Sequence, residues 1–140
     1  MFQALLQLAY VVSAALVQDL GTTAAVRTNV CELRANSSAF SGQVVSIDAT
    51  YRSDRRHFSL LTDKSCGPVR NTIEVGTNNS PSATSLWSRW EHECQKRGEG
   101  YCVVEAEVRV TGAVRRTSDG LFFDVSAMEL HSSRGPAGEA

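Results

Sequence analysis

The chain has almost no net charge and lacks the short motifs that mark common catalytic sites. Its 14 basic residues stand against 15 acidic residues, a formal charge of −1, so no global field draws it to nucleic acid or an anionic membrane. It contains no Gly-x-Ser-x-Gly, no His-Glu-x-x-His and no phosphate-binding glycine loop. His57, His92 and His131 are far apart in sequence. We therefore predict a protein that is not an enzyme and that needs no cofactor.

Cysteine is scarce and is never closely paired along the chain. The four cysteines are Cys31, Cys66, Cys94 and Cys102, an even number that fits two disulfides in an oxidising compartment, although four cysteines allow three pairings. No Cys-x-x-Cys is present, so we predict neither a metal site nor a redox-active pair. Cys94 lies on the apolar stripe of a predicted helix and Cys102 on the inward side of the next strand. These two are expected to pair, which leaves Cys31 for Cys66.

The first 25 residues contain no basic side chain and a single acid, Asp19. The stretch from Ala4 to Val17 is largely apolar, but it is too short for the roughly 20 apolar residues of a membrane span. Small residues follow it at 21–25, as at a signal-peptide cleavage site. We predict that 1–25 is a signal peptide and that the mature protein is secreted or periplasmic, with no membrane span. A buried N-terminal helix is the alternative.

Two segments alternate apolar and polar residues with a period of two, the pattern of a strand with one dry face. In residues 103–114, Val104, Ala106, Val108 and Val110 share one parity. In residues 43–52, the inward parity carries Val45, Ile47, Ala49 and Tyr51. Gly112 stands inside the longer segment, where a glycine suits a bend or bulge.

A helix is predicted between these two segments, with Ser80 as its N-cap, Pro81 at its first position and its end near residue 97. Leu86, Trp90 and Cys94 follow one another at i, i+4 and i+8, with Trp87 beside them. This apolar stripe predicts packing against a sheet, so we assign both tryptophans to the core. A shorter helix is predicted to begin after Asn29, because Glu32 completes a capping-box pattern.

The element order predicts a mainly β domain over residues 26–131, with a flexible tail at 132–140. Strands are expected at 43–52, 57–62, 71–76, 103–114 and 121–130, with the main helix between the third and fourth strands and the short helix in front. This is the order of an OB-fold, a five-stranded Greek-key barrel. The alternative is an open, twisted five-stranded sheet with one helix packed across it.

The ligands of OB-folds bind across strands two and three, between the loops 1–2 and 4–5. Both corresponding loops are rich in arginine, whose guanidinium binds phosphate or carboxylate through parallel hydrogen bonds. We therefore predict a ligand site there, with two aromatic residues for stacking. Its candidate residues are Tyr51, Arg52, Arg55, Arg56, His57, Phe58, Arg115 and Arg116. The alternative is that both loops are solvated polar turns, since Asp54 and Asp119 offset part of their charge.

Several short segments resemble a family of small, uncharacterised exported bacterial proteins with an OB-like barrel. They are Cys31-Glu32-Leu33, Phe40-Ser41-Gly42-Gln43-Val44-Val45, His57-Phe58-Ser59-Leu60-Leu61-Thr62-Asp63 and Ser65-Cys66-Gly67. The resemblance covers roughly residues 29–130 and is strongest over 29–76. It implies an OB-like fold and an exported protein, and it implies no catalytic residues.

These observations together predict an exported, non-enzymatic binding module. Its expected ligand is anionic: an oligosaccharide, a polynucleotide fragment, or an acidic patch on another envelope protein. The alternative is a structural or protein-interaction domain of the cell envelope that binds no small ligand.

Overall fold

The computed structural model describes residues 24–68, 71–98 and 102–131. The predicted signal peptide lies outside the described residues except for residues 24 and 25, and the predicted tail at 132–140 lies outside them entirely. None of the helices in the described ranges is long and apolar enough to cross a membrane.

The main elements within the described ranges are two α-helices and six strands. In chain order they are β1 (Val26–Thr28), α2 (Val30–Ala35), β2 (Val45–Ser53), β3 (Ser59–Thr62), β4 (Thr72–Gly76), α3 (Pro81–Lys96), β5 (Val104–Thr117) and β6 (Gly120–Leu130). Two short 3₁₀ helices, η1 (Ser37–Phe40) and η2 (Lys64–Cys66), lie in the connections. The predicted mainly β composition is confirmed.

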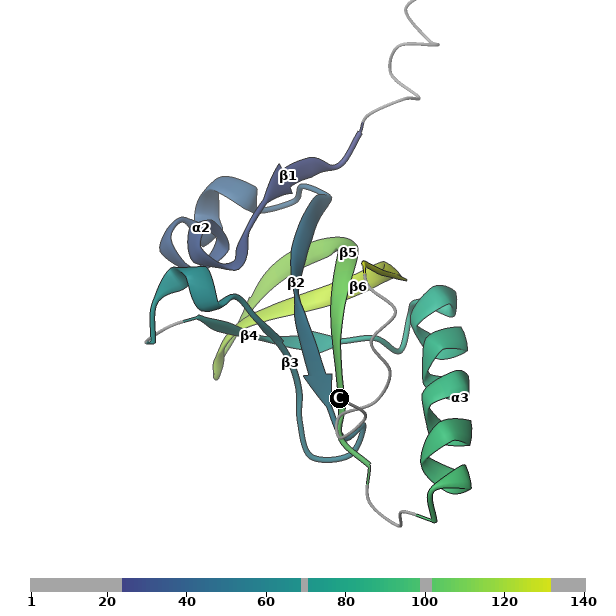
Figure 1. Ribbon diagram of the computed structural model, residues 1–140. Helices are drawn as coiled ribbons and strands as arrows, with labels where there is room; N and C mark the ends of the chain where they lie inside the picture. Colours follow the sequence, from purple (N-terminus) through teal and green to yellow (C-terminus); the bar gives the residue numbers. More distant parts are fainter. Residues whose placement is uncertain (1–23, 69–70, 99–101, 132–140) are drawn as a thin grey trace, which may run out of the picture.

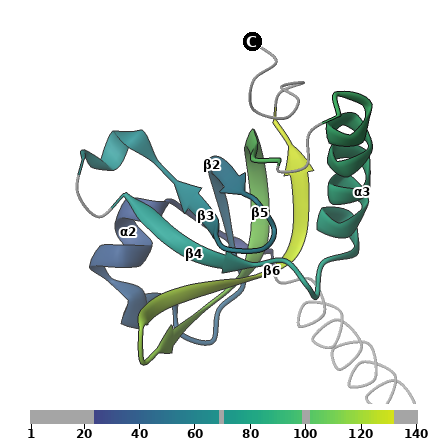
Figure 2. The same cartoon turned by 90° about the horizontal axis from the view of Figure 1, so that it is seen from below.

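Five strands form a closed barrel (Figures 1 and 2). The strand order is β2-β3-β4-β6-β5, and β5 pairs back with β2 along the whole of β2, from Ser53 opposite Val104 to Val45 opposite Gly112. The β4–β6 pairing is parallel, and the other four pairings of the barrel are antiparallel. Closure removes the two long unpaired edges that an open sheet would expose. The predicted barrel is therefore confirmed over the alternative of an open sheet.

The interior is filled by the predicted dry faces. Val45, Ile47 and Tyr51 of β2 are fully buried, and the inward residues of β5 from Val104 to Val110 are at most 1% exposed. A shift of one residue in the pairing of a strand would turn all of its inward apolar side chains outward, so the alternation fixes which face lines the interior.

Gly112 marks the bulge that the sequence predicts. The β5–β6 register shifts between Thr111 and Gly112, where β6 contains one additional residue. A Cβ atom at Gly112 would overlap the main-chain carbonyl of Asp124. Only glycine lets the two backbones approach this closely, so the pairing of β5 with the bulged part of β6 depends on it.

Both predicted helix starts are confirmed by their hydrogen bonds. The Asn29 side chain accepts from the Glu32 amide at 2.9 Å, and the Ser80 hydroxyl accepts from the Ala83 amide at 3.1 Å. The two helices lie on different sides of the barrel (Figures 1 and 2). On α3, the stripe of Leu86, Trp87, Trp90 and Cys94 is buried, as predicted.

The cysteines form the predicted pairs. Cys31 and Cys66 have Cα atoms 5.3 Å apart and tie α2 to η2. Cys94 and Cys102 have Cα atoms 6.1 Å apart and tie the end of α3 to the approach to β5. Both separations fall in the ordinary range for a disulfide.

The structure adds one strand to the prediction and moves the bounds of others. Strand β5 runs to Thr117 rather than to residue 114, so Arg115 and Arg116 lie on a strand and not in the predicted loop. Strand β1 was not predicted; it pairs in parallel with the start of β2, and three residues are too few to show a period. Strand β3 begins at Ser59 rather than His57, because the Asp54 carboxylate takes the main-chain amides of residues 56–58 that a strand would pair with a neighbour.

Candidate functional site

A continuous row of side chains crosses the outside of the barrel. Adjacent strands place Arg52 opposite Leu60, Leu60 opposite Glu74, Glu74 opposite Phe122, and Phe122 opposite Arg115. Their neighbours Tyr51, Leu61, Ile73, Val75 and Phe123 point inward and are buried. Because successive residues of a strand alternate faces, these five face outward. We call them the outer row.

Each end of the outer row carries an arginine over an aromatic ring. The Arg52 guanidinium lies 5.5 Å from the centroid of Phe58, and that of Arg115 lies 4.5 Å from the centroid of Phe122. Four strand spacings separate the two arginines, about 19 Å along the curved surface. A guanidinium that lies over a ring can still donate N–H groups to an oxyanion.

Both arginines are oriented by carboxylates without being removed from solvent. Arg52 lies 3.8 Å from Glu105 and its side chain is 54% exposed. Arg115 contacts Asp124 at 2.7 Å and its side chain is 56% exposed. Glu74, in the middle of the row, is exposed as well. Each end of the row therefore carries a guanidinium beside a carboxylate, and Glu74 adds a negative charge between the two ends, so the surface is not a uniformly basic track.

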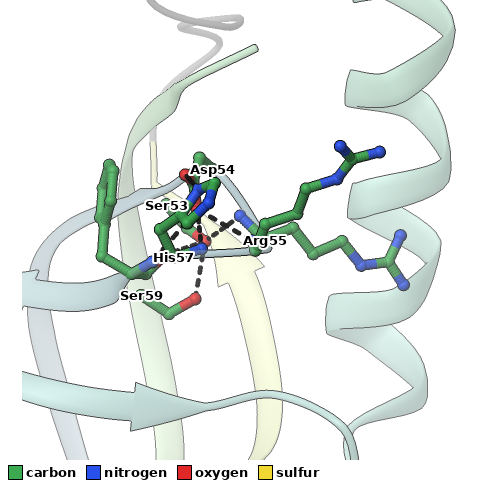
Figure 3. A network of polar contacts seen from close by, with 7 residues as sticks. Ser53, Asp54, Arg55, His57 and Ser59 are labelled. Carbon is green, nitrogen blue, oxygen red and sulfur yellow. Dashed lines mark hydrogen bonds and ion pairs between the residues drawn. The ribbon is translucent and has the colours of Figure 1, made fainter. Parts of the chain in front are cut away.

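The β2–β3 turn is organised by one buried carboxylate (Figure 3). The Asp54 side chain has no exposed area, and its Oδ1 accepts from the amides of Arg56, His57 and Phe58 at 2.8, 2.7 and 3.1 Å. Its Oδ2 lies 2.7 Å from Nδ1 of His57. Burial alone raises the pKa of the Asp54 carboxyl, but these hydrogen bonds outweigh it and hold the pKa well below its ordinary value.

Ser53 completes the turn from the other side. Its hydroxyl contacts the Phe58 carbonyl at 2.8 Å and the Ser59 hydroxyl at 2.6 Å, and it accepts from the Arg55 amide at 2.8 Å. Arg55 has a positive φ of 66°, a conformation that costs free energy for a residue other than glycine. The two serine hydroxyls thus hold the turn that presents Phe58 beneath Arg52.

The eight predicted ligand residues divide into five groups. Arg52, with the ring of Phe58 beside it, and Arg115 lie at the two ends of the outer row. Arg55 turns away, pairing with Glu91 and lying 5.5 Å over the ring of Trp87, both on α3. Arg56 and His57 are exposed on the turn.

Arg116 and Tyr51 make up the remaining groups. Arg116 donates to the Ser37 hydroxyl at 2.7 Å, away from the outer row. Tyr51 is fully buried; its hydroxyl accepts from Trp87 Nε1 at 3.0 Å, and its ring stacks on Trp90 with centroids 6.1 Å apart. Tyr51 therefore does not lie on the predicted ligand surface. It belongs to the inward-facing residues of β2, the same alternation from which the barrel was predicted.

Three members of the outer row were missed from the sequence: Leu60, Glu74 and Phe122. The outward direction of these residues could be predicted from the alternation along each strand, since Phe122 alternates with the inward Phe123. The pairing of β4 with β6 could not be predicted, because it joins segments that lie about 50 residues apart in the chain.

An acidic depression lies between β2, β5 and η2, with a volume of about 330 Å³, and its lining includes Asp48, Asp63, Glu105 and Glu107. Each carboxylate already has a partner. Asp48 pairs with Arg27, Arg109 and His131, Glu107 accepts from Thr50, Asp63 from Ser65, and Glu105 faces Arg52. The hydrogen bond from Arg109 is the largest influence on Asp48 and, with those from His131 and Arg27, holds the pKa of its carboxyl well below the ordinary value, against the effect of burial.

One set of possible metal-ligating atoms occurs in the described ranges. It comprises Cys31, Asp63 and Cys66, whose donor atoms lie within 4.8 Å of one another. Both sulfurs belong to the disulfide, so they are not thiolate ligands.

No protein-family model matches the chain, and no curated protein is similar to it. The resemblance to small exported bacterial proteins stays a prediction.

Proposed function

We propose that this domain is an exported, non-enzymatic OB-like binding module that takes an anionic ligand on its outer row. The observation that carries the proposal is the pair of arginine–phenylalanine stacks, one at each end of the row. Two guanidinium groups at the ends of a row about 19 Å long along the curved surface suit a chain-like ligand that carries separated negative charges.

The barrel supports the site that is proposed. Its strand order, with α3 between the third and fourth barrel strands, is the arrangement for which OB-folds bind oligomers across strands two and three. In this chain those strands are β3 and β4, which contribute Leu60 and Glu74 to the centre of the row. The two disulfides fit an oxidising compartment, which is consistent with a secreted or periplasmic location.

Glu74 limits the class of anionic ligand that the outer row would bind. A uniform polyanion would place a negative group against the Glu74 carboxylate, which costs free energy. A ligand with neutral, hydroxyl-bearing units between its charges would instead donate hydrogen bonds to it. We therefore favour an acidic oligosaccharide over a polynucleotide fragment, and expect Glu74→Gln to improve binding of single-stranded DNA or RNA.

The test is fluorescence anisotropy of the oxidised protein with a labelled anionic oligosaccharide, single-stranded DNA and RNA. The site variant is Arg52→Gln with Arg115→Gln. The matched control is Arg89→Gln with Lys96→Gln, which removes the same charge from exposed positions on α3. Binding that the site variant loses and the control retains supports the proposal; equal loss in both variants, or no binding by the native protein, contradicts it.

A second candidate function is contact with another envelope protein without any small ligand. Val26 and Val44, which are 42% and 53% exposed, lie side by side at the β1–β2 edge, where the Val26 amide donates to the Val44 carbonyl at 3.0 Å. Exposed apolar residues of this size favour a protein contact over an ionic ligand. This candidate predicts no anion binding in the anisotropy test.

A further inference from the structure

A small pocket lies beyond the Arg115 end of the outer row, between the β5–β6 hairpin and η1. It has a volume of about 200 Å³ and is lined by Ser37, Ser38 and Ser41, by Arg115 and Arg116, and by an apolar wall of Val114 and Leu121. Pockets for whole ligands usually exceed about 300 Å³. A pocket of this size suits a single chemical group.

The pocket contains a positive charge that no carboxylate neutralises. Arg115 is paired with Asp124, but Arg116 makes no ion pair with any residue in the described ranges and donates to the Ser37 hydroxyl at 2.7 Å. None of the seven lining residues is acidic. An oxyanion placed here therefore meets attraction from Arg116 without a competing negative group in the wall.

The serines supply hydrogen-bond donors in the number that a tetrahedral oxyanion requires. Ser37 accepts from Arg116, so its own O–H remains a donor. Ser38 and Ser41 are exposed and add two more hydroxyls. Three hydroxyl donors and a guanidinium match the three terminal oxygens of a phosphate or sulfate ester better than the two oxygens of a carboxylate.

We infer that the pocket formed by Ser37, Ser38, Ser41 and Arg116 binds a phosphate or sulfate ester group at one end of the ligand. This inference rests on the proposed function, since Arg115 belongs both to the outer row and to the pocket wall and so joins the two. The ligand chain lies along the outer row, and its terminal ester group enters the pocket.

The first experiment uses NMR amide spectra of the oxidised, full-length protein, titrated with inorganic phosphate and with sulfate at constant ionic strength set by chloride. Saturable shifts should be confined to residues 37–41 and 114–116. Arg116→Gln should weaken binding about tenfold or more, and Ser38→Ala with Ser41→Ala should weaken it less, whereas Arg89→Gln should not change it. Shifts that do not saturate, or that survive in Arg116→Gln, would overturn the inference.

The second experiment separates the inference from the proposed function and identifies the source of the ester. Labelled oligonucleotides with a 5′-phosphate or a 5′-hydroxyl, and oligosaccharides with or without a terminal sulfate, are compared. Tighter binding of one esterified probe, abolished by Arg116→Gln, supports the pocket. If the probes with and without the terminal ester bind equally well, and both lose binding in Arg52→Gln, the pocket is refuted and the proposed function stands. A terminal-ester effect in a protein whose affinity for every probe is unchanged by Arg52→Gln supports the pocket and refutes the outer row.

Discussion

Replacing Tyr51 by phenylalanine should destabilise the barrel and leave ligand binding unchanged. The substitution removes only the hydroxyl that accepts the Trp87 Nε1–H hydrogen bond at 3.0 Å. Both side chains are buried, at 0% and 3% exposure, so the indole N–H would lose its partner where water cannot replace it. An unsatisfied buried donor costs about 1–3 kcal/mol. At roughly 4 °C per kcal/mol for a domain of this size, Tm should fall by about 4–12 °C.

Urea unfolding of the oxidised protein, followed by tryptophan fluorescence, measures this cost. Trp87→Phe and the double variant complete a double-mutant cycle, in which the double variant should be more stable than the sum of the single losses implies, because no donor remains unpaired. A Tyr51→Phe variant of native stability that loses anionic ligand would refute the assignment of Tyr51 to the core.

Three further predictions concern stability. Folding lowers the pKa of Asp54, so its contribution to the free energy of unfolding is fully present above about pH 5 and is lost as the pH falls below about 4 toward the folded-state pKa. Asp54→Asn should therefore flatten the acid side of the curve of stability against pH. An unchanged acid side would contradict the hydrogen-bond network around Asp54. Gly112→Val should destabilise the barrel by about 1–3 kcal/mol more than Ala113→Val, since a Cβ at Gly112 overlaps the backbone of β6 whereas Ala113 already carries a Cβ; equal urea midpoints would show that the bulge does not require glycine at this position. Removal of the Cys31–Cys66 disulfide, with a sequence separation of 35, should cost about 4 kcal/mol on the chain-entropy model, and a loss below about 1 kcal/mol in calorimetry would contradict it.

The barrel was predictable because its longest strands are amphipathic over many residues. The alternation in β2 and β5 fixes which side chains are buried, and local caps at Asn29 and Ser80 fix where the helices begin. Such periodic patterns can be recognised within one segment of the sequence, without knowing which strands pair.

The site was only partly predictable, because the direction of an arginine depends on partners that are distant in sequence. Arg55 is drawn to Glu91 and Arg116 to Ser37, at separations of 36 and 79 residues. Arg52 and Arg115 reach one surface only through the pairing of β4 with β6. Loop composition therefore indicated a region of the barrel and could not select among its arginines.

The salt dependence of binding tests the central claim most directly. The affinity of the native protein for the labelled anionic oligomer should fall with increasing salt, because each guanidinium–oxyanion contact releases a counterion. The Arg52→Gln, Arg115→Gln variant should show a shallower slope of log affinity against log salt than the native protein, whereas Arg89→Gln, Lys96→Gln should keep the native slope. A native slope in the site variant would contradict binding on the outer row.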